Sequence, residues 1–115
     1  MKQLIVAIAI VTAITFPAVA APGACPALGS VRSANSNTRA TLHIANSSRW
    51  PVKIYWLDYQ GQRKFYKELK PGQDYKQSTF MTHPWIAVNP GGQCVDGVMR
   101  ARNPGENLME IFGDG

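Results

Sequence analysis

Short segments of alternating apolar and polar residues dominate the chain from about residue 40 onward. Turn-forming residues end these segments, as at Asn46-Ser47-Ser48, Lys70-Pro71-Gly72 and Asn89-Pro90-Gly91-Gly92. Beyond residue 20 no stretch keeps an apolar period of 3.6 residues, so we expect no long helix there. The pattern predicts an all-β fold, a small antiparallel β-sandwich of about seven strands. The expected strands are residues 41–45, 52–59, 63–69, 74–80, 85–88, 93–100 and 107–112.

The segment 52–59 differs from the others because both of its faces are apolar. One face carries Val52, Ile54 and Trp56, and the other carries Tyr55, Leu57 and Tyr59. One face is expected to enter the core. The second is either a partly exposed recognition surface or a surface covered by loops and the neighbouring sheet, and periodicity does not decide between them.

The N-terminus has the three parts of a secretory signal peptide. Met1-Lys2-Gln3 is positively charged, residues 4–16 are almost wholly apolar, and Ala18-Val19-Ala20 matches a cleavage site. The apolar run is short for a membrane-spanning helix, and Pro22 occupies the place where a lipoprotein signal needs a Leu-like residue. We therefore expect cleavage before Ala21, no transmembrane segment in the mature chain, and a secreted or periplasmic protein.

The remaining chain is long enough for one domain. Residues 21–38 are rich in Ala, Gly, Ser, Asn and Pro and predict an N-terminal arm, which leaves residues 39–115 for the sandwich. The 115-residue chain is 45% apolar and 17% charged, which suits a packed core. Its net charge is +5, but the basic residues are scattered among acids and aromatics, so we expect no nucleic-acid partner.

Two cysteines, Cys25 and Cys94, are the only ones in the sequence. In an exported domain of this size, a pair of cysteines predicts one disulfide. A bond closing so long a loop stabilises by roughly 4 kcal/mol in the chain-entropy model, mainly by restricting the unfolded chain. Neither cysteine has a histidine close in sequence, so a nucleophilic role is not favoured.

Three motifs in order resemble a known family. They are Tyr55-Trp56-Leu57-Asp58-Tyr59-Gln60-Gly61, then Phe65-Tyr66-Lys67-Glu68-Leu69-Lys70-Pro71-Gly72, then Thr79-Phe80-Met81-Thr82-His83-Pro84-Trp85. Together they resemble the von Hippel-Lindau β-domain family, and more closely its small exported bacterial members that carry this domain alone. The resemblance runs from about residue 41 to residue 98. It implies a β-sandwich, which agrees with the strand pattern.

The resemblance also implies a pocket for 4-hydroxyproline in a partner peptide or protein. By position, Trp56, Tyr66 and Trp85 would form aromatic walls, while Thr79 and His83 would meet the ligand hydroxyl. Thr79 stands where the von Hippel-Lindau tumour suppressor of this family has serine, and the methyl group of Thr79 adds bulk. Structural roles remain open for each: Trp56 and Trp85 as core, Tyr66 as a strand aromatic, and His83 as a cap before Pro84. The family's helical elongin-binding domain has no counterpart after residue 98, so no elongin-type ubiquitin-ligase partner is expected.

Other chemistry has little support in the sequence. His43 and His83 lack a third metal ligand at a recognisable spacing, and no cofactor motif is present. The chain has no nucleophile elbow and no phosphate-binding glycine loop, which argues against an enzyme such as a small hydrolase. The leading hypothesis is a secreted module that binds proline or 4-hydroxyproline. The alternative is a structural or assembly component of the cell envelope that has no hydroxyproline specificity.

Overall fold

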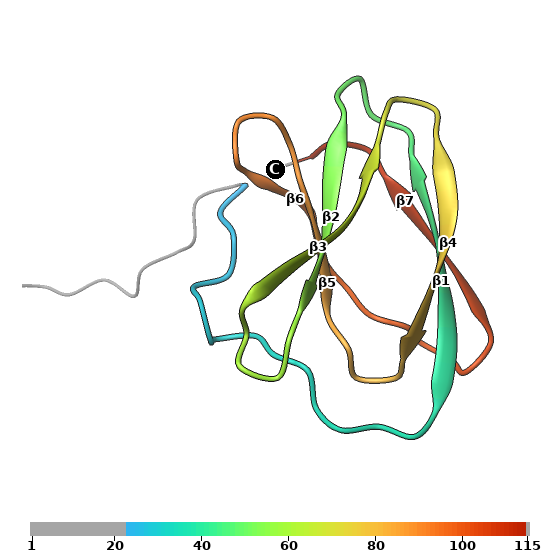
Figure 1. Ribbon diagram of the computed structural model, residues 1–115. Helices are drawn as coiled ribbons and strands as arrows, with labels where there is room; N and C mark the ends of the chain where they lie inside the picture. Colours follow the sequence, from blue (N-terminus) through green and yellow to red (C-terminus); the bar gives the residue numbers. More distant parts are fainter. Residues whose placement is uncertain (1–22, 115) are drawn as a thin grey trace, which may run out of the picture.

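The computed structural model describes residues 23–114, and this part of the chain contains seven strands and no helix. The all-β prediction is confirmed, and each expected strand is present, three with the expected bounds and four with ends shifted by one or two residues (Figure 1). The predicted signal peptide lies outside the described residues. The strands are β1 (Arg39–Asn46), β2 (Val52–Leu57), β3 (Arg63–Leu69), β4 (Asp74–Phe80), β5 (Trp85–Val88), β6 (Cys94–Met99) and β7 (Glu106–Ile111).

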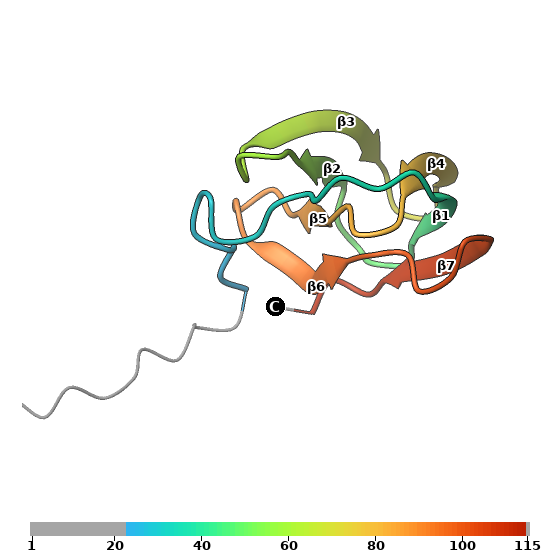
Figure 2. The same cartoon turned by 90° about the horizontal axis from the view of Figure 1, so that it is seen from below.

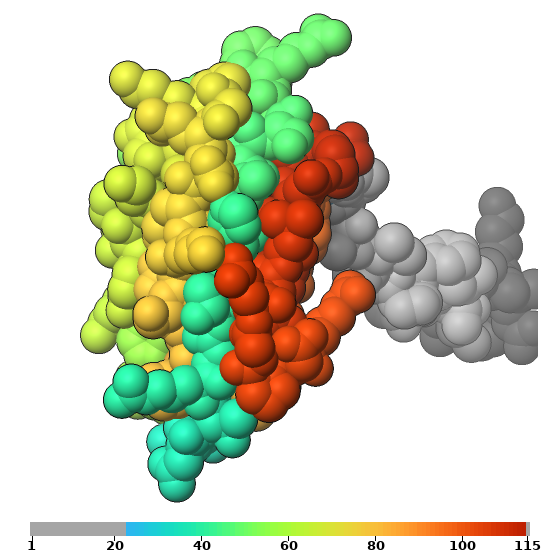
Figure 3. Space-filling model, turned by 90° about the vertical axis from the view of Figure 1, so that its right-hand side faces the viewer, coloured from blue at the N-terminus to red at the C-terminus, as the bar shows by residue number. Residues whose placement is uncertain are grey.

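Two sheets pack face to face to form the sandwich. One sheet has the strand order β4-β1-β7 and the other has the order β3-β2-β5-β6. Every pair is antiparallel except β1 and β7, because the last strand returns beside the first strand in the same direction. Figure 3 shows β4, β1 and β7 side by side, in yellow, teal and red, on one face of the molecule. Consequently, β4 and β3 are edge strands of their sheets, and the chain passes directly from one to the other.

Alternating side chains from both sheets fill the space between them. Leu42 and Ile44 of β1, like Val52 and Ile54 of β2, are 0 or 1% exposed. Fully burying an aliphatic side chain of this size contributes about 1.5 to 3 kcal/mol, so these alternating positions account for much of the stability. Trp85 of β5 belongs to the same core cluster, and Trp56 packs against it.

The second apolar face of β2 is covered. Leu57 joins Ile86, Val88 and Cys94 in a separate buried cluster. Cys25 and Val31, which precede the first strand, pack against this cluster from outside. The interpretation that loops cover this face therefore holds for most of it. Tyr55 is half-buried, with its ring edge-on to exposed Phe65 at 5.8 Å.

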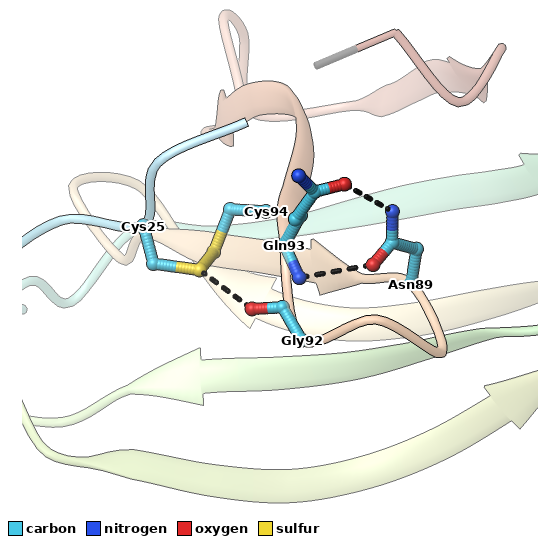
Figure 4. Close-up of a disulfide and its surroundings, with 5 residues drawn as sticks. All are labelled: Cys25, Asn89, Gly92, Gln93 and Cys94. Atoms are coloured by element: carbon cyan, nitrogen blue, oxygen red, sulfur yellow. Dashed lines mark hydrogen bonds between the residues drawn. A yellow bond between two sulfur atoms is a disulfide. The ribbon is translucent and has the colours of Figure 1, made fainter. Parts of the chain in front are cut away.

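The covering segment is the N-terminal arm, residues 23–38. It runs along the outside of the β3-β2-β5-β6 sheet and then crosses one end of the sandwich to reach β1 (Figures 1 and 2). The predicted disulfide between Cys25 and Cys94 is confirmed and fastens the arm to β6 (Figure 4). Within residues 23–114, no helix is long and apolar enough to cross a membrane.

Candidate functional site

A pocket of about 600 Å³ opens where the edges of the two sheets approach each other. Its lining comes from both sheets and from the turns beside them, and it includes all five residues that the sequence singled out. Among these lining residues Arg39 carries the one formal charge at neutral pH and there is no carboxylate. The lining residues are Arg39, Ala40, Thr41, Trp56, Tyr59, Tyr66, Ser78, Thr79, Phe80, His83, Trp85 and Pro104.

Three aromatic rings form walls of this pocket, as the resemblance implies. The ring of Tyr66 meets Trp85 edge-on with a centroid separation of 4.7 Å, and it meets Trp56 edge-on at 6.5 Å. Trp85 is only 2% exposed, whereas Tyr66 is 47% exposed. Trp85 therefore belongs both to the core and to the pocket, and Tyr66 forms the outer rim.

A β-bulge places Tyr66 on the pocket side. The register between β2 and β3 shifts at this point, because Ile54 pairs with Lys67 while Tyr55 pairs with Phe65. Tyr66 is thus the extra residue, and a bulge of this kind re-aims a side chain. Phe65 remains beside Tyr55 on the outer surface, while Tyr66 faces the tryptophans.

Tyr59 is a pocket residue that the sequence interpretation placed wrongly. Strand alternation assigned it to the face opposite Trp56, but β2 ends at Leu57 and a turn follows. In this turn, Asp58 Oδ1 accepts hydrogen bonds from the backbone N–H groups of Gln60 and Gln62, at 2.9 and 2.8 Å. Period-two alternation no longer applies, and the Tyr59 ring lies edge-on to Trp56 at 5.5 Å. An Asp followed closely by Gly61 was the available signal for this turn.

His83 lies at the centre of the aromatic group and is 5% exposed. Its ring stacks on Trp56 at 5.5 Å, and its Nε2 is 3.5 Å from the hydroxyl of Tyr59. Burial lowers the pKa of His83 below its ordinary value, although a hydrogen bond to the backbone of Ala34 opposes this effect. The imidazole is therefore neutral at neutral pH and keeps one nitrogen as an acceptor.

Thr79 has a contact that the sequence could not show. Its Oγ1 accepts a hydrogen bond of 2.8 Å from the indole Nε1 of Trp85, and Thr79 is 5% exposed. This bond orients the Trp85 wall. The hydroxyl proton of Thr79 is not used in it and is still able to donate.

The indole Nε1 of Trp56 is buried and has no hydrogen-bond partner among residues 23–114. A buried donor without an acceptor costs about 1 to 3 kcal/mol. Among residues 23–114, no other buried side-chain nitrogen or oxygen lacks a partner, so this unpaired donor is a cost of building the aromatic cluster.

His43 lies away from this cluster. It occupies the outer face of β1, where its ring nitrogens pair with Asp74 and, at 3.7 Å, with Glu106. Across residues 23–114, no three side chains of His, Cys, Asp or Glu are placed to hold a metal ion. His43 and His83 therefore lie in separate parts of the structure.

The pocket combines apolar rings with a few hydrogen-bonding groups. Such a lining suits a small apolar ring that bears a polar substituent. Comparison with known families gives one match: residues 31–94, more than half of the chain, match the family model described as the VHL beta domain. The match begins within the arm and ends at the disulfide-bonded Cys94.

Proposed function

The chain belongs to the VHL beta domain family, whose members recognise hydroxyproline, and from this premise we propose that it binds a proline- or 4-hydroxyproline-containing segment of a partner protein. The observation that carries the proposal is the pocket of Trp56, Tyr66 and Trp85 with His83 and Thr79 beside it. A pyrrolidine ring packs well on aromatic faces, and its hydroxyl needs partners once it leaves water.

The polar groups of the pocket complement a hydroxyl. Neutral His83 offers Nε2 as an acceptor, because its contact with the Tyr59 hydroxyl is long at 3.5 Å, and Thr79 offers its hydroxyl proton because its oxygen already accepts from Trp85. A ligand hydroxyl both donates and accepts, so it pairs with both groups at once. A proline ligand would leave the Thr79 hydroxyl proton unpaired and His83 Nε2 with only its long contact to Tyr59, and this difference is the proposed source of selectivity.

We propose further that the module works outside the cytoplasm. The Cys25–Cys94 disulfide supports this, because such bonds persist in oxidising compartments. The predicted signal peptide of residues 1–20 would deliver the chain there.

The test uses pairs of peptides that differ only in having proline or 4-hydroxyproline at one position, measured by calorimetry. Tyr66→Ala should weaken binding by about 2 kcal/mol, as is usual when an aromatic side chain that the ligand covers is truncated. Phe65→Ala is the matched control, because Phe65 is the neighbouring exposed aromatic of β3 but faces the outer surface. Tyr66 and Phe65 are both substantially exposed, so neither variant should impair folding.

Thr79→Ser tests the effect of the extra methyl. If the methyl crowds the ligand ring, this variant should bind hydroxyproline more tightly than wild type. The proposal fails if wild type and Thr79→Ser both bind the two peptides no better than a scrambled sequence. That result would favour the alternative, a component of envelope assembly without hydroxyproline specificity.

A further inference from the structure

The arm contacts both turns that bring non-strand aromatic residues to the pocket. Turn 58–62 carries Tyr59, and turn 81–84 carries His83. None of the residues lining the pocket precedes Arg39, so residues 23–38 act on the site through the turns and the pocket residue His83 that they contact.

The first contact fastens the arm to turn 58–62. Ser33 is 6% exposed, and its Oγ donates a hydrogen bond of 2.6 Å to the Leu57 carbonyl. The backbone N–H of Ser33 donates to the Asp58 carbonyl at 3.0 Å. A Cβ at Gly61 would lie 2.5 Å from the Cα of Gly29, so only glycine permits this close approach of the two backbones.

The second contact fastens the arm to turn 81–84. The hydroxyl of Thr82 donates to the Ala34 carbonyl at 2.9 Å, and the N–H of Met81 donates to the Thr38 carbonyl at 2.9 Å. Thr82 has a φ of 73°, a left-handed conformation that is costly for a β-branched residue. Such a conformation persists only where surrounding contacts hold it, and the bond to Ala34 is one of them.

The far end of the arm is anchored covalently. Cys25 is bonded to Cys94, whose backbone N–H also donates to the Gly23 carbonyl at 3.0 Å. Figure 4 shows the turn before Cys94, in which Asn89 Oδ1 accepts from the N–H of Gln93 at 2.9 Å. The arm is therefore held between this fixed point and β1, with its contacts to the two turns in between.

We propose that the arm is a positioning element of the binding site: through Ser33, Gly29 and Ala34 it fixes the turns of Tyr59 and His83, so that selectivity for the ligand hydroxyl depends on residues outside the pocket. The ligand in this inference rests on the proposed function. The placement of His83 by the arm does not, and it is measured without ligand.

The test compares two glycine substitutions with the same backbone strain. Gly61 has a φ of 77° and Gly72 has a φ of 83°, but a Cβ at Gly72 meets nothing within 4 Å. Gly61→Ala therefore displaces the arm, whereas Gly72→Ala is the matched control. Thr82→Val removes the hydroxyl that donates to Ala34 and keeps the β-branched shape, and Thr82→Ser retains the hydroxyl.

NMR titration of the ligand-free, oxidised protein gives the first measurement, and the signals of His83 are simple to assign because the chain has only two histidines. Loosening the arm admits water to His83 and also weakens its hydrogen bond to the Ala34 backbone. Burial is the larger of these two opposing effects, so Gly61→Ala and Thr82→Val should raise the pKa of His83 toward 6.5. Gly72→Ala and Thr82→Ser should titrate like wild type. In the peptide assay, the preference for hydroxyproline over proline should be about fivefold smaller in Gly61→Ala and Thr82→Val than in wild type.

The inference is overturned if His83 titrates as in wild type in folded Gly61→Ala and Thr82→Val. If Gly61→Ala does not fold, the comparison of Thr82→Val with Thr82→Ser decides. If wild type binds neither peptide, the proposed function fails, and the titration still shows whether the arm positions His83.

Discussion

Replacing Thr79 by valine should remove the hydrogen bond that orients the Trp85 wall. Valine has nearly the shape of threonine, so the change deletes an acceptor without opening a cavity. The Trp85 indole is 2% exposed and donates to Thr79 Oγ1 at 2.8 Å, so its N–H would be left buried without a partner. Stranding such a donor costs about 1 to 3 kcal/mol.

This loss is large for a domain whose total free energy of unfolding is about 5 to 15 kcal/mol. With a urea m-value of about 2 kcal/mol/M, a loss of about 2 kcal/mol lowers the unfolding midpoint by about 1 M. Thr38→Val is the control, because Thr38 is exposed, and it should change stability by less than about 0.5 kcal/mol.

Hydrogen exchange at the indole N–H separates the lost bond from a general loss of packing. The N–H of Trp85 should exchange slowly in wild type and in Thr79→Ser, which keeps the acceptor, and faster in Thr79→Val. If Thr79→Val has wild-type stability and an unchanged indole exchange rate, the bond does not hold the Trp85 wall and the reasoning is wrong.

Four further predictions concern the protonation of His83 and of Tyr75, the contact of Tyr59 with His83, and maturation. Because burial lowers the pKa of His83 in the folded protein, the imidazole of the unfolded chain is protonated first as the pH falls. The free energy of unfolding should therefore decrease as the pH drops below about 6.5. Urea titrations of His83→Gln should show a smaller decrease. Burial raises the pKa of Tyr75, so stability should fall above pH 10, and Tyr75→Phe should lessen that loss. Tyr59→Phe should raise the pKa of His83, since the Tyr59 hydroxyl near Nε2 favours the neutral ring, whereas Tyr55→Phe on the outer side should leave the NMR titration unchanged. Intact mass should show that the exported protein begins at Ala21, and two alkylated thiols without reductant would contradict the disulfide.

The strands could be predicted from the sequence because their signals are local. Alternation such as that of Leu42 and Ile44 reflects one buried face, and a pair such as Pro71-Gly72 ends a strand wherever it folds. The disulfide could be predicted too, since the two cysteines of a chain expected to be exported have only each other as partners in the same molecule. The family motifs in addition indicated five residues that the structure brings together in one pocket.

The remaining features depend on contacts between distant segments, which no local pattern contains. Tyr66 reaches the pocket because the pairing of β2 with β3 slips by one residue, and pairing register is a property of two strands together. Tyr59 lines the same pocket because turn 58–62 ends the alternation of β2. The arm packs against this turn because the backbone of Gly61 lies close to that of Gly29. Composition marked the arm as a linker, but the packing of Cys25 and Val31 on the outer apolar cluster makes it part of the fold. Local residue preferences thus set where strands form, whereas the side chains that meet at the pocket are set by the register and docking of segments that only the folded chain brings together.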